Sequence, residues 1–374
     1  MRRVPIRYIN DGATLANNIY TNTGEILLRR GASLTQNKLD RLIKLGYNSL
    51  YINDEFSNNE IDDLIDPVLR MKSKKNLKDA FEDFNTYVNQ MKNSSTVSKK
   101  AVTKLRYGYL SNITNSATSI VEKLLLNKEI EINIQDIKNM EEYLYQHSVN
   151  VAVLSVLFGI AMGFSYEKLN ALAIGSLMHD IGYNFIDSDV LMKKEKLSDE
   201  EYKQVKTHTE LGYHHLKDNI DISAHIRMIV YQHHEYMDGS GYPKGLKGED
   251  ISELAKMVAI ADIYDALTSD RPYRDALSPL EANEVLLAHA INQLDPGLVR
   301  KFTKLVVPYP IGTLVKLSND EIGVVEDIDA DFPMRPVIRV VLFRDRKVEI
   351  ITRDLMKENN ILITGIQYEI PRYS

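Results

Sequence analysis

Over the first 52 residues, hydrophobic positions follow a strand pattern, then a helical pattern, then a strand pattern again. Residues 19–20 and 26–28 are apolar and flank Asn22-Thr23-Gly24, a turn sequence, so they predict a β-hairpin. Residues 35–45 carry apolar side chains at helical spacing, and Gly46 follows, a residue type that commonly ends helices. With a returning strand expected at residues 49–52, the pattern predicts a small α/β domain over residues 1–55.

Residues 56–130 are more polar and rich in Lys, Glu and Asn, with apolar residues at intervals of three or four. This spacing predicts one or two long helices, with a weak point at Asn93-Ser94-Ser95. A helical linker and a dimerisation segment both fit, because the heptads are too irregular to choose between them. A homodimer through residues 56–130 is therefore one expectation.

From residue 131 to residue 306 the helical spacing is strong, and Pro308-Tyr309-Pro310 then breaks it. Beyond this break the hydrophobic period changes to two, which predicts four short strands at residues 313–317, 322–326, 337–343 and 348–351. The whole pattern predicts a mainly α fold. A helical bundle over residues 131–306 forms its core, and a small β-rich domain covers residues 307–374.

Composition narrows the possible chemistry. The 374 residues carry a net charge of -6, which gives no support for binding a nucleic-acid polymer through its backbone. The sequence contains no cysteine, so any metal must be held by His, Asp or Glu. The longest apolar stretch, residues 149–164, is interrupted by Asn150 and Ser155 and is too short for a typical membrane span. The N-terminus lacks a signal-peptide pattern, so a cytoplasmic protein is expected.

Five of the nine histidines lie in four short segments that also carry carboxylates or glycines. The histidines of these segments, with one adjacent carboxylate, are His147, His179-Asp180, His208 and His233-His234. Asp262 lies within a further apolar helix, where an unpaired buried carboxylate would be costly and a metal or close partner is expected. Outside these segments, His214 and His215 are expected to be exposed.

Such a set of side chains can hold two metal ions. An aspartate has two oxygens and can bridge two metals, while neutral imidazoles fill the outer positions. Two metals about 4 Å apart can share a hydroxide, direct it at phosphorus and stabilise the leaving oxygen. Nitrogen and oxygen ligands without sulfur suit Fe or Mn, and zinc is not excluded. A lone helical histidine is more often structural, but the doublets and their order favour a metal site.

The order of these segments resembles the HD-GYP subgroup of the HD superfamily. Two stretches are highly specific: residues 233–246, His-His-Glu-Tyr-Met-Asp-Gly-Ser-Gly-Tyr-Pro-Lys-Gly-Leu, and residues 261–274, Ala-Asp-Ile-Tyr-Asp-Ala-Leu-Thr-Ser-Asp-Arg-Pro-Tyr-Arg. The resemblance covers residues 130–306, close to half of the chain. It implies an HD-type helical bundle with a bi- or trinuclear metal centre, and hydrolysis of cyclic di-GMP to pGpG or onward to GMP.

Residue by residue, the resemblance implies metal ligands, a substrate loop and phosphate-binding arginines. The implied ligands are His147, His179, Asp180, His208, His233, His234 and Asp262. Asp180 would bridge the metals, and Gly241-Tyr242-Pro243 would lie beside the substrate. Arg271 and Arg274, nine and twelve residues after Asp262, would hold its phosphates, because a guanidinium group can grip two phosphate oxygens. A solvated helix cap is the alternative for these arginines.

Two positions depart from the family pattern. Members usually have Lys after His-Asp-Ile-Gly, whereas this chain has Tyr183, which can donate a hydrogen bond but brings no full charge. Lys193, Arg271 or Arg274 could compensate. Trinuclear members carry a glutamate four residues before the first histidine, where this chain has Tyr143. The adjacent Glu142 would point about 100° away on a helix, so two metals, Fe or Mn, are expected.

Three functions stay open. The first is a metal-dependent phosphodiesterase in which Asp180 holds a bridging hydroxide, while Arg271, Arg274 and Tyr183 act on the phosphate. The second is a cyclic di-GMP sensor of weakened activity, which Tyr183 would mark. The third is a hydrolase of another cyclic dinucleotide, because the sequence does not determine which base is recognised.

Overall fold

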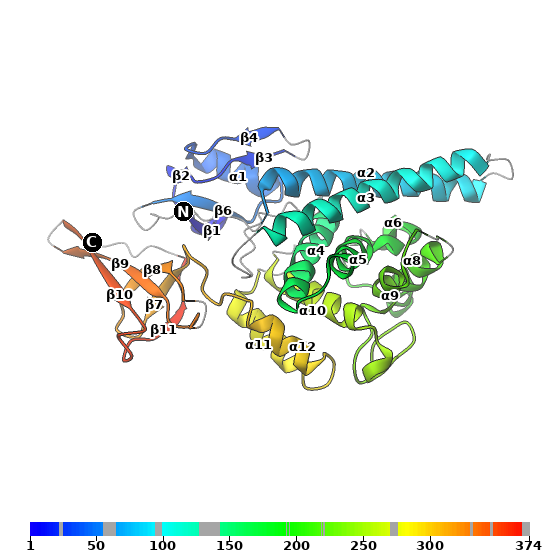
Figure 1. Cartoon of the computed structure of the whole chain (residues 1–374). Helices are drawn as coiled ribbons and strands as arrows, with labels where there is room; N and C mark the ends of the chain where they lie inside the picture. The colour runs from blue at the N-terminus through cyan, green and yellow to red at the C-terminus, as the bar shows by residue number, and fades with distance from the viewer. Residues whose placement is uncertain are drawn as a thin grey trace.

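The structure is a computed structural model that describes residues 1–21, 25–54, 65–93, 99–126, 143–191, 193, 195–217, 219, 221–269, 276–329, 332–344 and 347–368. A small N-terminal sheet, a large body of helices and a five-stranded C-terminal sheet follow one another along the chain (Figure 1). The predicted mainly α fold with two small sheet-containing ends is confirmed. The N-terminal strand region and the chain end meet, because the Tyr8 and Tyr368 rings stack with centroids 5.7 Å apart.

The N-terminal unit is an antiparallel sheet in the order β1-β6-β2-β5. Its strands are β1 (Arg2–Pro5), β2 (Ala13–Leu15), β5 (Ser33–Leu34) and β6 (Ser49–Asn53), and the 3-10 turn η1 covers Ile6–Tyr8. The predicted hairpin is formed by β3 (Ile19–Tyr20) and β4 (Ile26–Leu28), and the predicted helix is α1 (Gln36–Lys44). Gly46 ends α1 with a φ of +85°, a conformation in which a side chain would be strained. These three local predictions are confirmed.

Two long helices connect this unit to the bundle, α2 (Pro67–Asn93) and α3 (Lys99–Leu125). They pack against each other as a hairpin and lie across α4 (Figure 1). Leu77 and Phe81 of α2 and Ile120 of α3 are buried in the same hydrophobic cluster as the bundle helices that follow. A domain boundary at residue 130 stays a prediction, while the helices on both sides of it share one core.

Helix α4 (Tyr143–Ala161) runs through the centre of the bundle. Its window Leu144–Ala161 is long and apolar enough to cross a membrane by length and composition alone, and 78% of it is buried inside the protein. A helix that is apolar on every side is typical of the middle of a large core. The two polar interruptions seen in the sequence, Asn150 and Ser155, are both fully buried.

Shorter helices surround α4. They are α5 (Tyr166–Met178), η3 (Ile181–Phe185), α6 (Ser188–Leu191), α7 (Asp199–Lys206), α8 (His208–Leu216), α9 (Ala224–Gln232), η4 (Gly248–Asp250), α10 (Glu253–Thr268), α11 (Pro279–His289) and α12 (Pro296–Thr303). Side-chain caps set where several of them begin, and Ser198 with Glu201 forms a capping box at α7. Ser223 caps α9 and Asp295 caps α12 in the same way, through backbone N–H groups of the first turn.

The C-terminal sheet has five antiparallel strands in the order β10-β9-β8-β7-β11. They are β7 (Leu314–Leu317), β8 (Ile322–Asp327), β9 (Val337–Arg344), β10 (Lys347–Asp354) and β11 (Ile363–Ile366). The first four strands were predicted. Strand β11 was missed because it is short and its partner is β7, far back in the chain.

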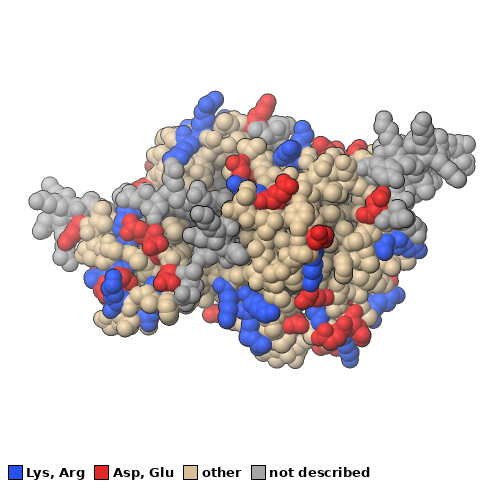
Figure 2. Space-filling view, viewed as in Figure 1, with Lys and Arg blue, Asp and Glu red and all other residues tan. Residues whose placement is uncertain are grey.

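On the described surface, Figure 2 shows basic and acidic side chains interspersed over one face of the molecule. Such a mixture agrees with the modest net charge of -6. The recognition chemistry of this protein is therefore sought in local sites rather than in a broad field.

Candidate metal centre

The structure gathers all seven predicted ligand side chains, which come from α4, α8 and α10 and from the ends of α5 and α9. Figure 1 shows these helices side by side in the bundle. Two groups have ligand atoms that all lie within 4.8 Å of one another: Asp180, His208, His233, His234 and His147, His179, Asp180. Asp180 belongs to both groups. Asp262 joins the second group, because its Oδ1 lies 2.9 Å from His147 Nε2. We refer to these seven residues as the His/Asp cluster.

Helix ends place most of the cluster. His179 directly follows α5, His208 opens α8, and His233 directly follows α9. Gly182, two residues after Asp180, lies so close to α8 that an added Cβ would fall 1.8 Å from the His208 carbonyl oxygen. Only glycine fits there, and the close approach brings the His179-Asp180 turn against the start of α8.

Backbone carbonyls orient three of the histidines. His179 Nδ1 donates to the Ser176 carbonyl at 2.7 Å, and His208 Nδ1 donates to the Val205 carbonyl at 2.9 Å. His233 Nδ1 lies 3.1 Å from the Val230 carbonyl. Because a carbonyl only accepts, each Nδ1 carries a proton, and Nε2 is the ring nitrogen that is left to face the site.

The positions of these Nε2 atoms fit a cation. His208 Nε2 and His233 Nε2 lie 3.3 Å apart, and Asp180 Oδ1 lies 3.4 Å and 3.8 Å from them. His179 Nε2 is buried and has no hydrogen-bond partner among the described residues, although Asp180 Oδ2 is 3.1 Å away. Electron-pair donors that face one another in a buried site need a proton or a metal ion between them. The donor set therefore fits divalent metals.

The electrostatics favour neutral rings for His208 and His234, whereas burial of His179 is outweighed by the neighbouring Asp180, which raises the pKa of that ring. Burial lowers the pKa of His208 to about 4, and Asp180 offsets only part of that drop. Burial also holds the pKa of His234 well below its usual value. For Asp180, burial alone would raise the pKa, but the neighbouring His179 and the other imidazoles hold it well below its usual range. Neutral imidazoles around an ionised carboxylate are the forms that bind metal.

His147 is held differently, by two carboxylates. Its Nδ1 lies 2.6 Å from Asp265 Oδ2, and its Nε2 faces Asp262 Oδ1. Burial would lower the pKa of His147, but hydrogen bonds to Asp262 and Asp265 raise it to about 9. Sequence reasoning missed Asp265. The available signal was its spacing, three residues after Asp262, which places both carboxylates on one face of α10.

The loop that was expected beside the substrate does lie beside the cluster. The Tyr242 ring centroid is 4.8 Å from that of His234, and Tyr242 N donates to the His234 carbonyl at 3.0 Å. Buried Glu235 holds the loop, because its two oxygens accept from Lys244 N at 2.7 Å and Leu246 N at 2.9 Å. An added Cβ on Gly241 would lie 2.4 Å from the His234 carbonyl oxygen, so the close return of this loop requires glycine.

Tyr183, at the position of the usual lysine, packs against the cluster. Its ring centroid lies 4.3 Å from that of His208, with 32° between the ring planes. The compensating cation suggested by the sequence, Lys193, hydrogen-bonds both oxygens of Glu201 at 2.7 Å, so its charge is already matched. Arg271 and Arg274 lie outside the described residues. Glu142 does too, and α4 begins at Tyr143, so the expectation of two metals stays a prediction.

A different cation, Lys206, lies near the cluster. Its Nζ is 5.2 Å from the Tyr242 ring centroid and 4.6 Å from that of Tyr202. Both rings offer their faces to the ammonium, a favourable arrangement for a cation. Sequence reasoning missed Lys206, although it stands only two residues before His208.

The expectation for His215 was wrong. His214 is exposed as predicted, but His215 is half-buried and its Nε2 lies 2.7 Å from the hydroxyl of Tyr109 on α3. This contact ties α8 to the α2–α3 hairpin. It lies apart from the His/Asp cluster.

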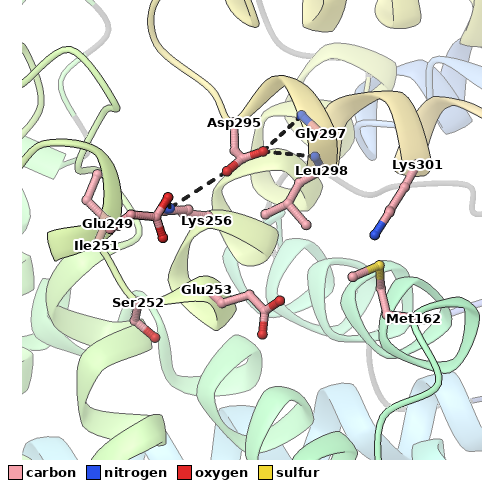
Figure 3. Close-up of a pocket in the computed structure, with 10 residues that line it drawn as sticks. All are labelled: Met162, Glu249, Ile251, Ser252, Glu253, Lys256, Asp295, Gly297, Leu298 and Lys301. Atoms are coloured by element: carbon pink, nitrogen blue, oxygen red, sulfur yellow. Dashed lines mark hydrogen bonds and ion pairs between the residues drawn. The ribbon is translucent and has the colours of Figure 1, made fainter.

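A cavity of about 420 Å³ opens near the start of α10, and none of the seven cluster residues lines it (Figure 3). The buried Lys256 lies against it, with Nζ 3.7 Å from Asp295 Oδ2 and 3.6 Å from Glu249 Oε1. Asp295 in turn accepts from the N–H groups of Gly297 and Leu298 at the start of α12. These contacts join α10 to α12.

Comparison with known proteins agrees with this geometry. Residues 131–298 match the family model of the HD domain, and residues 314–368 match a KOW domain associated with the HD domain. Residues 131–298 form an HD domain. The HD resemblance predicted from the motifs is thereby confirmed, and the second match covers the five-stranded sheet.

Relatives of this HD domain include named phosphodiesterases. Over 241 residues the chain is 34% identical to the cyclic di-GMP phosphodiesterase PA4108 of Pseudomonas aeruginosa, a match covering 63% of this chain and 58% of that protein. It is 34% identical over 166 residues to the 3'3'-cGAMP-specific phosphodiesterase 1 of Vibrio cholerae, covering 44% and 37%. The chain thus spans about half the length of the curated relatives it matches.

Among solved structures, Bd1817, a HDG"Y"P protein from Bdellovibrio bacteriovorus, aligns with 81% of this chain and 98% of its own length. The identity is 18% and the TM-score is 0.46. Through its sequence relatives, the HD domain of this chain is related to cyclic di-GMP and cGAMP phosphodiesterases, and it contains a buried His/Asp cluster suited to metal.

Proposed function

We propose that this protein is a metal-dependent phosphodiesterase that hydrolyses cyclic di-GMP to pGpG, GMP or both. The observation that carries the proposal is the position of Asp180, which belongs to both metal-binding groups of the cluster. A carboxylate shared by two donor sets is what a two-metal hydrolytic centre requires. The names of the relatives support the substrate class, since they act on cyclic dinucleotides.

Two divalent metal ions, Fe or Mn, would be held by the seven cluster residues and would supply Lewis-acid activation of water and phosphate. The protein's own part is orientation. Carbonyl-bonded His179, His208 and His233 keep their Nε2 atoms directed into the site. Glu235 fixes the Gly241-Tyr242-Pro243 loop, which would form one wall of the substrate site.

Lys206 would supply the charge that Tyr183 does not. Its ammonium group lies over Tyr242, whose ring packs on His234, so it is placed to meet a phosphate that reaches the cluster. A full positive charge near the phosphate stabilises the negative charge that grows during hydrolysis. Tyr183 would act mainly by packing on His208. Arg271 and Arg274 remain candidates for the second phosphate.

The substrate could also be another cyclic dinucleotide. The relative named as specific for 3'3'-cGAMP is as identical to this chain as the first cyclic di-GMP phosphodiesterase, at 34%. Turnover rates of cyclic di-GMP, 3'3'-cGAMP and cyclic di-AMP, measured at equal concentration, distinguish cyclic di-GMP from another cyclic dinucleotide as the substrate. Faster turnover of 3'3'-cGAMP would reassign the substrate while keeping the enzyme class.

A sensor of weakened activity is the remaining alternative, and it rests on Tyr183. It predicts metal and nucleotide binding without turnover, and a rise in rate for Tyr183→Lys. An unchanged rate in that variant would count against the sensor. The direct test of the enzyme is full-length protein loaded with Mn or Fe and given cyclic di-GMP, with Asp180→Asn as the inactive reference. No product at any metal loading would refute the proposal.

Three broader expectations also stand as proposals: boundaries at residues 55, 130 and 306, a homodimer through residues 56–130, and a cytoplasmic location. Light scattering at micromolar concentration tests the homodimer. A clean monomer would count against it.

A further inference from the structure

A buried line of hydrogen bonds connects helix α2 to the metal centre. Arg70 Nη1 donates to Asn150 Oδ1, and Asn150 Nδ2 donates to Asp265 Oδ1 at 3.1 Å. Asp265 Oδ2 then accepts from His147 Nδ1 at 2.6 Å, and His147 Nε2 faces Asp262. The line passes from α2 to α4 and α10 and returns to α4. We call Arg70, Asn150 and Asp265 the relay.

The chemistry of the relay leaves each group one role. A guanidinium group only donates and a carboxylate only accepts, so Asn150 must turn its oxygen to Arg70 and its nitrogen to Asp265. Asp265 can then accept a hydrogen bond from the Nδ1–H of His147, which leaves Nε2 to face the cluster. Arg70, Asn150 and Asp265 are 6%, 0% and 2% exposed, so water cannot readily replace a lost partner.

Arg70 lies outside the HD domain, which matches residues 131–298. It sits in the first turn of α2, where its N–H donates to the Asp66 carbonyl at 3.0 Å and Asp66 Oδ1 accepts from Val68 N. Helix α2 also packs against η3, the segment that carries Tyr183. The start of α2 therefore reaches the cluster from a part of the chain that the domain motifs do not contain.

We propose that Arg70 is a positioning residue of the metal centre: through Asn150 and Asp265 it fixes the ring of His147. The seating of the first turn of α2 thereby sets metal affinity, and the N-terminal unit that precedes α2 could alter it. The effect on turnover rests on the proposed phosphodiesterase function. The effect on metal affinity does not, since it concerns the ligand geometry of the His/Asp cluster and not the identity of the substrate.

The test compares Arg70→Met with Arg70→Lys and with Lys75→Met in the full-length protein. Lys75 is an exposed lysine of α2, so its variant loses the same charge without touching the relay. The measurements are the apparent Mn affinity in competition with a chelator, the metal content per chain, and kcat and KM on cyclic di-GMP. Loss of an outer partner of a metal ligand is expected to weaken Mn binding about 10-fold. Lys75→Met should bind Mn like the wild type, and Arg70→Lys should recover part of the affinity.

Non-additivity gives a second readout. If Arg70 acts through Asp265, the double variant Arg70→Met with Asp265→Asn loses no more Mn affinity than Asp265→Asn alone. Fully additive losses would overturn the relay, as would an Arg70→Met protein that binds Mn within about two-fold of wild type. If Arg70→Met does not fold, Arg70→Lys is compared with the wild type. Weaker Mn binding by Arg70→Lys supports the relay, and Mn binding within about two-fold of the wild type overturns it. The expected losses of Mn affinity in the variants, together with no turnover in the wild type, would instead refute only the phosphodiesterase.

Discussion

The histidines of the metal centre are oriented by two different kinds of partner, backbone carbonyls and side chains. His179, His208 and His233 each use Nδ1 to reach a carbonyl three residues back in their own segment. His147 instead depends on Asp265, Asn150 and Arg70, side chains from three separate parts of the chain. The orientation of the three carbonyl-bonded histidines follows from local helix geometry. The orientation of His147 requires three helices to be packed correctly, so mutation or regulation can tune it.

Asp180 belongs to both metal-binding groups of the cluster, so its loss is expected to have the largest effect. Asp180→Asn removes the charge shared by both metal-binding groups and should reduce bound metal to near zero. Turnover should fall by more than roughly 100-fold, the upper range for losing a mere outer partner. Metal analysis and kcat measure the two effects. The control is Asp189→Asn, an exposed aspartate of α6. Retention of two metals by Asp180→Asn would contradict the shared-ligand assignment.

The next largest effect distinguishes His147, which side chains orient, from the histidines that backbone carbonyls orient. Asp265→Asn leaves one acceptor oxygen for two donors, the Nδ1–H of His147 and the Nδ2–H of Asn150, so the link that orients His147 is broken at one of these two bonds. The carbonyl-oriented histidines stay intact. We expect the affinity of the weaker metal to fall by about 10- to 100-fold, while the other metal stays bound. Metal titration followed by calorimetry would show two sites in the wild type and one strong site in the variant. An equal loss of metal affinity at both sites would show that the orientation of His147 does not act on one site alone.

The ligand set could be predicted because its residues occur in short, ordered motifs. The relay could not, since residues 70, 150 and 265 are far apart and a polar residue on a helix does not reveal its partner. The prediction that His215 is exposed was wrong for the same reason, because its partner Tyr109 lies 106 positions away in the sequence. Apolar spacing predicted that α2 and α3 are helices but not which surface covers them. Strand β11 was missed because its register is set by β7 and not by its own short sequence.

A smaller effect is expected on the substrate side. Lys206→Met keeps the length of the side chain and removes its charge, so kcat/KM should fall by about 10-fold while metal content stays unchanged. Lys203→Met is the matched control, because Lys203 is an exposed lysine of the same helix. An unchanged kcat/KM would remove Lys206 from the substrate site and leave Arg271 and Arg274 as the candidate cations.

The smallest effect concerns the loop wall. Glu235→Gln can accept only one of the two backbone N–H groups that Glu235 now binds, so one partly buried donor of the loop loses its partner. The free energy of unfolding should fall by about 1–3 kcal/mol, and KM should rise while metal affinity is retained. Chemical denaturation and steady-state kinetics measure these quantities. A loss of metal in this variant would mean that the loop and the cluster form one unit.

We propose that Asp180 is shared by two metal sites and that the protein uses both metals to hydrolyse a cyclic dinucleotide. The most direct measurement titrates Mn or Fe into metal-free full-length protein while bound metal and cyclic di-GMP hydrolysis are recorded together. We expect two metals per chain, with pGpG or GMP appearing only as the second site fills. Full occupancy without product from any cyclic dinucleotide, or full activity with a single metal per chain, would contradict it.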